Sequence, residues 1–453
     1  MENQPQQFTA KPKSNFTDSL LFKLGLILIL ILLLLIPSSW IQSIIWERSQ
    51  RQDEVIKEIS DKWASEQLLE GPVLVLPYKT IVTETDKTGK MLSRELVKNV
   101  YILPEALHMD AKVAPEILHR GIFDAVVYNT KIKVNGKFSP LELQKSGIRP
   151  ELIQWDKARV VIGISDLKGL KNNPLVNFGG KSYAVETDFS ALALFKNNLV
   201  ILPDLSTGKQ TALGFNFDLD LRGSDDLSFL PLGKTTTVNV SGDWDNPSFT
   251  GRNLPEQRKI GEKTFSAAWK IPYFNRPYAQ QWIGDNDALQ NKTETAFGVK
   301  FILPVDQYQK TTRSAKYGVL IILLTFISLF FTEIIIKKKV HIFQYILIGA
   351  AMIIYYVLLL SFSEQLGFNL AYLIASAATV LLISVFIAAL LKQRKPAFLF
   401  GAILSVFYGF IFVIIQLQDL ALLFGSVGLF IIIAILMYFS TKIDWAKYNT
   451  PQA

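Results

Sequence analysis

The sequence contains no cysteine and only three histidines among its 453 residues. The missing thiols exclude disulfides, thiol catalysis, iron–sulfur clusters and lipid attachment through cysteine. His108, His119 and His341 belong to no HExxH motif and have no second ligand at metal spacing, so we interpret them as isolated side chains. Walker loops and the GxSxG nucleophile elbow are also missing. We therefore expect no catalytic residue, metal ligand or cofactor, and the sequence predicts a protein that is not an enzyme.

Hydrophobic residues make up 50% of the chain, which is too apolar for an ordinary soluble enzyme. The excess lies in six apolar runs, each about long enough to cross the ~30 Å hydrocarbon core of a bilayer once. The first run, at 20–40, continues into a helical segment and lacks a small-residue cleavage site, so we interpret it as an uncleaved anchor. The others lie at 317–336, 342–362, 368–391, 397–415 and 420–438.

Lysine and arginine occur in alternate connections between these runs. Because positively charged flanks are retained on the cytoplasmic side, the pattern predicts that both termini are cytoplasmic and that 46–315 lies outside. The basic residues are Lys11, Lys13 and Lys23 before the first helix, Lys337 to Lys339 after the second, Lys392, Arg394 and Lys395 after the fourth, and Lys442 and Lys447 after the sixth.

The formal net charge of +8 comes from the same basic residues beside the apolar runs. Its surplus lies in the cytoplasmic flanks, where it attracts anionic headgroups, and the external segment is close to neutral. We therefore predict membrane lipids as partners and exclude nucleic acid.

The start of the external segment, 46–70, is charged but has Val55, Ile59 and Trp63 at helical spacing. This stripe predicts a stalk helix that packs on the following domain and ends at Gly71-Pro72.

From residue 73 onward the apolar period changes to two. Alternation is clear at 131–136, 215–223 and 237–242, and 159–165 is apolar enough for a deeply buried strand. Four segments that close on Leu-Pro after Val or Ile should mark strand ends or edges, because proline cannot donate to a ladder; they contain Pro77, Pro104, Pro203 and Pro304. The predicted fold class is a membrane α-helical bundle of six transmembrane helices plus a large, mainly antiparallel β domain outside the cytoplasm.

Trp244 lies in the segment 242–251, whose Asp, Asn and aromatic residues could form a carboxylate pair or a sugar platform. The same Asp, Asn, Pro and Gly residues are typical of a tight turn, with Trp244 and Phe249 packing over its edge, and we favour the turn.

Glu333 is the only acidic residue within the apolar runs. It precedes Lys337 by four residues, and we interpret it as a snorkelling ion pair or a lipid-facing charge and not as a transport site. Arg313, with Tyr308 and Tyr317, is interpreted as an interfacial anchor. The sequence gives no explanation for Tyr355 and Tyr356 at mid-membrane.

Several short segments stand in an order and spacing that together are specific. The segments are 35–37 followed by Glu47-Arg48, Gly71-Pro72, Ser165-Asp166, 226–231, Trp244 with 247–249, Asp306 to Gln309 with Tyr308, Arg313, Lys316-Tyr317, His341, Gln344-Tyr345, Ser363-Glu364, Gly367-Phe368 and 443–445. In these segments the sequence resembles the CreD family of inner-membrane cell envelope integrity proteins. The resemblance implies an inner-membrane location, a periplasmic domain and a role in envelope integrity, stress response or colicin tolerance, and it implies no catalytic residue.

The predicted organisation is a cytoplasmic tail (1–19), a transmembrane helix (20–45), a stalk helix (46–70), a periplasmic β-rich domain (71–315), a five-helix bundle (316–440) and a second cytoplasmic tail (441–453). The leading hypothesis is a non-enzymatic protein whose β domain binds an envelope protein or glycan. The alternatives are a transporter or lipid-handling protein that uses the bundle, and a membrane enzyme that acts on envelope precursors. The enzyme would need external carboxylates such as Asp166, Asp225, Asp226, Asp243 and Asp245.

Overall fold

The structure is a computed structural model. It describes residues 20–85, 91–140, 147–187, 194–206, 212–284, 289, 292–303, 307–336, 338–417 and 420–441. The chain forms two compact units, one containing Met1–Gln52 and Val305–Ala453 and the other Asp53–Pro304. We describe each unit by itself and call them the helical unit and the β unit.

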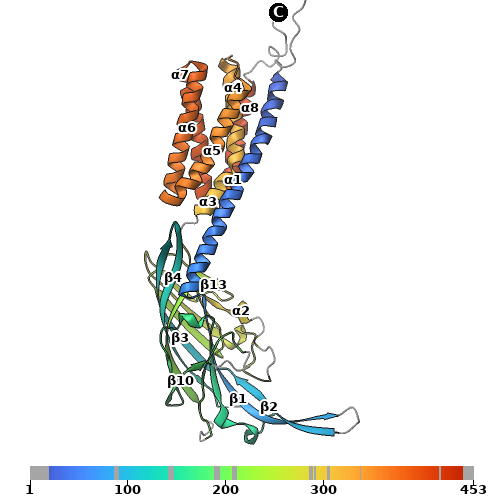
Figure 1. Ribbon diagram of the computed structural model, residues 1–453, viewed down its shortest axis with the longest axis vertical. Helices are drawn as coiled ribbons and strands as arrows, with labels where there is room; N and C mark the ends of the chain where they lie inside the picture. Colours follow the sequence, from blue (N-terminus) through green and yellow to red (C-terminus); the bar gives the residue numbers. More distant parts are fainter. Residues whose placement is uncertain are drawn as a thin grey trace, which may run out of the picture. The chain divides into compact units, whose positions relative to one another are not determined.

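The helical unit contains the first part of α1 (Leu20–Trp63) together with α3 to α8 (Figure 1). Within the described residues six helices are long and apolar enough to cross a membrane, which confirms the predicted number. The later helices are α3 (Gln307–Lys316), α4 (Gly318–Ile336), α5 (Ile342–Leu366), α6 (Phe368–Leu391), α7 (Arg394–Gln416) and α8 (Ala421–Thr441).

Local signals set the ends of these helices. His341 caps α5: its Nδ1 accepts from the backbone N–H of Phe343 at 3.2 Å, and Gln344 closes the capping box. Gly367 alone separates α5 from α6, and its φ of 78° suits glycine. The predicted connection at 363–367 is therefore almost entirely helical, which places Glu364 in the last turn of α5.

The β unit contains two mainly antiparallel sheets, with parallel pairing only between β1 and β11 and between β3 and β12 among the described strands. The nine-stranded sheet has β1 (Gln67–Thr85), β2 (Met91–Ile102), β5 (Arg159–Ile164), β8 (Glu186–Thr187), β9 (Asn198–Ile201), β11 (Asp226–Phe229), β13 (Pro247–Gly251), β16 (Gln281–Ile283) and β17 (Phe297–Phe301). The eight-stranded sheet has β3 (Ala106–Arg120), β4 (Phe123–Phe138), β6 (Leu175–Phe178), β7 (Lys181–Ala184), β10 (Leu213–Ser224), β12 (Thr235–Gly242), β14 (Gln257–Ile260) and β15 (Phe265–Pro272).

The sheets pack face to face, because one apolar core contains alternating residues from both, such as Leu74 and Leu76 of β1 and Met109 and Ala111 of β3. A second cluster covers the other face of the nine-stranded sheet, and Val73 and Val75 belong to it. Central strands of this sheet are thus buried on both faces. This confirms the deeply buried strand predicted at 159–165, and β4, β10 and β12 confirm the three alternating segments.

The predicted end of the stalk helix at Gly71-Pro72 is wrong. Helix α1 stops at Trp63, and β1 begins at Gln67, because Gln67 pairs with Leu227 of β11 and Leu69 with Ile164 of β5. Pairing with neighbouring strands overrides the helical pattern of the stalk's last residues. Gly71-Pro72 lies inside β1, where the register with β5 shifts between Glu70 and Val73.

The stripe itself packs as predicted. Val55 and Ile59 are buried in the β unit, and the Arg222 guanidinium lies over the Trp63 ring at 5.2 Å. Glu58 on the same helix forms an ion pair with Arg120.

The predicted end of the β domain at 315 is also wrong. The last described strand ends at Phe301, and residues Gln307–Lys316 form α3 of the helical unit. This segment was assigned to the external domain because of its polar composition. Its buried face, Tyr308, Thr311 and Ser314, recurs at helical spacing and is itself polar.

The Leu-Pro pairs have different outcomes. Pro104 and Pro203 follow the ends of β2 and β9, as predicted. Pro77 lies inside β1 opposite Asn99 of β2, past the end of the pairing with β5 at Val75. On that side its carbonyl accepts from the backbone N–H of Gln154 at 2.8 Å, and the missing N–H of proline leaves no ladder bond unmade. Pro304 lies outside the described residues.

Candidate functional site

Glu333 of α4 is part of a polar cluster that joins three helices of the helical unit. Its carboxylate forms an ion pair with Lys23 of α1 and accepts a hydrogen bond from the hydroxyl of Tyr345 on α5 at 3.2 Å. The Lys23 amino group also donates to the carbonyl of Val340 at 3.0 Å. The Glu333 side chain is only 11% exposed, so the predicted lipid-facing charge is wrong. Its ion-pair partner is Lys23, whereas Lys337 lies outside the described residues.

A second polar cluster contains Arg48, Tyr308 and Glu364. The Tyr308 hydroxyl donates to Glu364 Oε1 at 2.9 Å, and Arg48 Nε lies 3.9 Å from the same oxygen. Tyr308 is buried, so it is more than an interfacial anchor. Arg313 lies half-buried on α3 and Glu47 lies exposed on α1. Asp306 lies outside the described residues.

Four tyrosines from α5, α6 and α7 form what we call the tyrosine cluster: Tyr355, Tyr356, Tyr372 and Tyr408. The ring of Tyr355 contacts the other three, at centroid distances of 4.7 Å to Tyr356, 6.0 Å to Tyr372 and 4.9 Å to Tyr408. The Tyr372 hydroxyl donates to the backbone carbonyl of Tyr408 at 2.8 Å. The cluster explains the two tyrosines at mid-membrane, and the interior of the bundle is more polar than the sequence indicates.

In the β unit, two of the predicted carboxylates come together with one that the sequence analysis missed. Glu66 lies beside Asp225 and Asp226, and Lys300 forms an ion pair with Asp225 at 2.7 Å. Burial, followed by the charges of Asp225 and Asp226, raises the pKa of Glu66. Burial also raises the pKa of Asp226, although Ser228 and Thr250 donate hydrogen bonds to its carboxylate. Like charges that lie close together in a partly buried site, as in this acidic cluster, favour protonation of one of them, which agrees with the direction of both pKa shifts.

The other predicted carboxylates lie elsewhere. Asp166 caps a short helical turn and accepts from Ser65, which together hold the pKa of Asp166 below its ordinary value against the opposing effect of burial. Asp243 and Asp245 are exposed on either side of Trp244, which is buried against Phe301 at 6.4 Å. The chain crosses here from β12 in the eight-stranded sheet to β13 in the nine-stranded sheet. The predicted tight turn over 242–251 is therefore wrong in its extent, because only 243–246 connect the strands and 247–251 form β13. Among the described residues no group of three or more His, Asp or Glu side chains is arranged to hold a metal ion.

Glu70 is the most deeply buried acidic residue among the described parts of the β unit. Its carboxylate lies 2.9 Å from the amino group of Lys292, which also donates to the carbonyl of Leu194 at 3.2 Å and lies over the ring of Phe195. Burial raises the pKa of Glu70, and Lys292 opposes that rise. The pair ties the interior of β1 to α2 (Lys292–Thr295), so we assign it a structural role.

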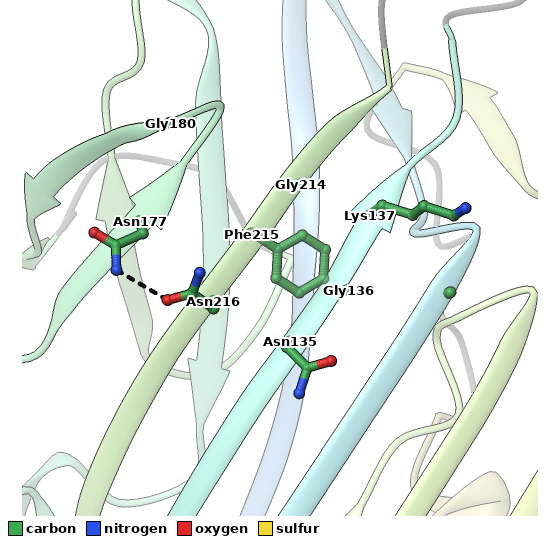
Figure 2. A pocket seen from close by; sticks show the side chains of 9 residues that line it. Asn135, Gly136, Lys137, Asn177, Gly180, Gly214, Phe215 and Asn216 are labelled. Atoms are coloured by element: carbon green, nitrogen blue, oxygen red, sulfur yellow. Dashed lines mark hydrogen bonds between the residues drawn. The ribbon is translucent and has the colours of Figure 1, made fainter.

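A shallow hollow of about 560 Å³ lies on the outer face of the eight-stranded sheet (Figure 2). Asn135, Asn177, Asn216 and Lys137 line it, and Asn177 donates to Asn216 at 2.9 Å. Because Lys137 is its only titratable lining residue, the hollow has amide groups for hydrogen bonding but no acid–base pair for catalysis.

The far ends of β1 and β2 form a two-stranded ribbon, which we define as residues 79–85 and 91–98. Figure 1 shows that it extends beyond the rest of the β unit. Pairing of β1 with β5 ends at Val75, and pairing of β2 with β16 begins at Val100, so no described strand flanks the ribbon on either side.

One face of the ribbon exposes three apolar side chains among polar ones. Ile81 lies opposite Glu95, Val97 opposite Lys79 and Met91 opposite Thr85, so the register puts all three apolar residues on the same face. Their exposed fractions are 72% for Ile81, 57% for Val97 and 76% for Met91. A two-stranded ribbon is marginally stable alone in water, and Ile81 and Val97 are diagonal neighbours that expose apolar surface side by side.

The arrangement is that of a multi-pass membrane protein whose membrane-spanning unit is assembled from both ends of the chain, with a double-sheet β unit inserted between them. The family model for inner membrane protein CreD matches residues 19–446. The chain is 30% identical over 424 residues to inner membrane protein CreD of Escherichia coli (strain K12), and the match covers 93% of each chain. The chain therefore belongs to the CreD family of inner-membrane proteins.

Sequence reasoning missed Lys23, Tyr345, Tyr372, Tyr408 and Glu66 as members of these clusters. Lys23 had a signal, because a lysine inside an apolar run needs a partner, and Glu333 was the only acidic residue available in the other runs. The tyrosines gave no such signal in the sequence, because aromatic residues are common in membrane helices and only packing brings their rings together.

Proposed function

We propose that this protein is a non-enzymatic envelope integrity protein with both termini in the cytoplasm and its β unit in the periplasm, where the unit binds another envelope component, a protein or a glycan. The distribution of lysine and arginine supports this orientation. The name of the relative supports the inner membrane as the location. Envelope stress response and tolerance of colicin-type toxins are the processes that we expect to depend on it.

The observation that carries the proposal is the exposure of Ile81, Val97 and Met91 on one face of the ribbon. A water-exposed β unit gains no stability from Ile81, Val97 and Met91 as they stand, and burying them against a partner would contribute roughly 1.5–3 kcal/mol for each fully covered side chain. The Lys79–Glu95 ion pair on the same face is exposed and contributes little, so it would act in orientation more than in affinity.

Site-specific photo-crosslinking in living cells tests the proposal. A photoreactive amino acid at Ile81 or Val97 should give a discrete adduct with an envelope component, whereas the same group at Asn239, exposed on β12, should not. Ile81→Lys and Val97→Lys should also fail to complement a deletion strain while leaving the thermal stability of the protein unchanged. Identical crosslinking at all three positions, or full complementation by both lysine variants, would contradict the proposal.

A transport or lipid-handling function is a second candidate, favoured by the intramembrane Lys23–Glu333 pair and the tyrosine cluster. It predicts solute flux or lipid movement in proteoliposomes that is lost in Glu333→Gln. If the activity is found and survives that substitution, the pair is structural.

The acidic cluster favours a third candidate, an enzyme that acts on envelope precursors. Asp226→Asn and Glu66→Gln would then abolish complementation without lowering protein stability. Full complementation by both variants would exclude this candidate.

A further inference from the structure

Three hydroxyl groups of the tyrosine cluster are fully enclosed and have no hydrogen-bond partner among the described residues. They belong to Tyr355, Tyr356 and Tyr408, whose residues are 0%, 3% and 2% exposed. In a bilayer no water reaches such groups from the lipid side, and an unsatisfied polar group in an apolar surrounding is costly. A dry bundle would favour phenylalanine at these positions.

Helix α3 adds a further group of this kind. The Ser314 hydroxyl is fully buried and also has no described partner. Helix α3 contacts α4, α5, α6 and α7, and it lies at one end of the bundle (Figure 1). Beyond it, Gly318 at the start of α4 lies against the Tyr356 hydroxyl, so closely that a Cβ at residue 318 would be 2.9 Å from that oxygen. Ser314 thus lies four residues along the chain from a residue that contacts the tyrosine cluster.

From this arrangement we propose that the tyrosine cluster, together with Ser314, is a hydrated binding site under α3 for an uncharged hydrogen-bond-accepting group. Water is the smallest such ligand, and the hydroxyl or carbonyl group of a solute is chemically equivalent. The site lies in the helical unit and does not depend on the ribbon or on its partner.

The residue types select this class of ligand. Phenolic hydroxyls donate to an acceptor, and no member of the cluster carries a charge that would compensate an ion. A cation held by the ring faces is excluded, because the Tyr355 ring already packs on its three neighbours. Lys310 of α3 is directed elsewhere: its amino group donates to Gln416 at 3.1 Å and lies over the ring of Phe368.

Removal of the Tyr356 and Tyr408 hydroxyls tests the proposal in the full-length protein. In a dry bundle the double variant Tyr356→Phe/Tyr408→Phe would raise the melting temperature, because it deletes buried unpaired groups. If the hydroxyls bind water or a ligand, the melting temperature falls, as it should in the control Tyr372→Phe, which loses an observed hydrogen bond. An unchanged or raised melting temperature of the double variant would overturn the proposal.

Thiol labelling gives a second test that does not rely on the tyrosines, and the cysteine-free chain provides a clean background. Ser314→Cys should react with a small water-soluble methanethiosulfonate more than about tenfold faster than Thr325→Cys, because only a hydrated thiol ionises readily. Thr325 is equally buried but its hydroxyl is bonded within α4. Equal rates would overturn the proposal, and selective protection of Ser314→Cys by inorganic phosphate would contradict the uncharged class of ligand.

Discussion

Gly71 lies where β1 changes its pairing register with β5, and its backbone has a φ of 102°. A Cβ at this position would lie 3.0 Å from the carbonyl oxygen of Val161. We expect Gly71→Ala to lower the free energy of unfolding of the β unit by about 1–3 kcal/mol, because it combines backbone strain with a close contact. Denaturant titration followed by tryptophan fluorescence measures this change.

Gly214→Ala is the matched control for that prediction. Gly214 also lies in a strand, β10, but it is exposed and a Cβ there would meet only one atom, at 4.0 Å. Gly214→Ala should change the free energy of unfolding of the β unit by no more than about 0.5 kcal/mol. A loss for Gly71→Ala no larger than that of the control would refute the role assigned to Gly71.

The buried Glu70–Lys292 pair gives a prediction of larger size. Lys292→Met removes the partner of a buried carboxylate and should cost about 3–5 kcal/mol of unfolding free energy at pH 7. The pKa of Glu70, already raised by burial, then rises further. The deficit should therefore shrink as the pH is lowered, because protonation removes the uncompensated charge.

The double variant Glu70→Gln/Lys292→Met checks the cause of that loss. It should recover a large part of the lost free energy and should lose the added pH dependence. Equal losses in the single and double variants would show that Lys292 acts through packing on Phe195 instead.

At the scale of elements, α1 is held to α4 and α5 by a charged contact inside an apolar unit. Lys23→Met leaves Glu333 with the Tyr345 hydroxyl as its remaining described partner. Because both side chains keep some exposure, we expect a loss of about 1–3 kcal/mol, measured as a lower melting temperature in detergent.

A double-mutant cycle separates the pair from its surroundings. Lys23→Met/Glu333→Leu should be more stable than the sum of the two single variants predicts, with a coupling energy of about 0.5–3 kcal/mol. Additive effects would mean that the two charges do not interact in the folded protein.

The accuracy of the sequence analysis also differs between elements. The membrane helices could be located closely, since apolar length alone decides them: the predicted run at 368–391 coincides with α6. Helix α3 could not be located from the sequence, because its buried face is polar and hydropathy predicts that such a segment is exposed to water. The end of α1 depends on strand pairing of Gln67 with a residue more than a hundred positions away, which no local pattern encodes.

The candidate sites also divide into residues that the local sequence reveals and residues that only long-range packing reveals. Glu333 and Asp226 could be singled out as unusual residues of their segments, and Lys23 could be paired with Glu333 as a lysine inside an apolar run. Glu66 could not be found, because packing of distant segments determines its contact with Asp226. Sheet pairing likewise decides that the three apolar residues of the ribbon share one face.

At the scale of the whole molecule, the acidic cluster makes the stability of the β unit depend on pH. The pKa values of Glu66 and Asp226 are raised in the folded state, so their contribution is largest when both are protonated and is lost as the pH rises through the folded pKa values. We expect the free energy of unfolding to increase as the pH is lowered from 7 into the acidic range. Asp166 and Glu105, whose pKa values are lowered, oppose this trend as the pH falls through their ordinary values toward their folded ones.

Asp226→Asn tests the assignment. The variant should be more stable than the parent protein at pH 7 and should show a weaker increase toward pH 5, measured by denaturant titration at each pH. An unchanged slope would assign the pH dependence to other groups, of which Glu70 is the first to test.

The distance between Lys23 and Glu333 along the chain also affects how the protein is made. The two residues are 310 positions apart, and the entire β unit is synthesised between them. At ~5–20 residues per second, a ribosome needs roughly 15–60 s to reach Glu333 after Lys23. During that interval Lys23 lacks the carboxylate that pairs with it in the folded unit, and its long side chain, near the start of the apolar run, can reach the lipid headgroups until the bundle closes.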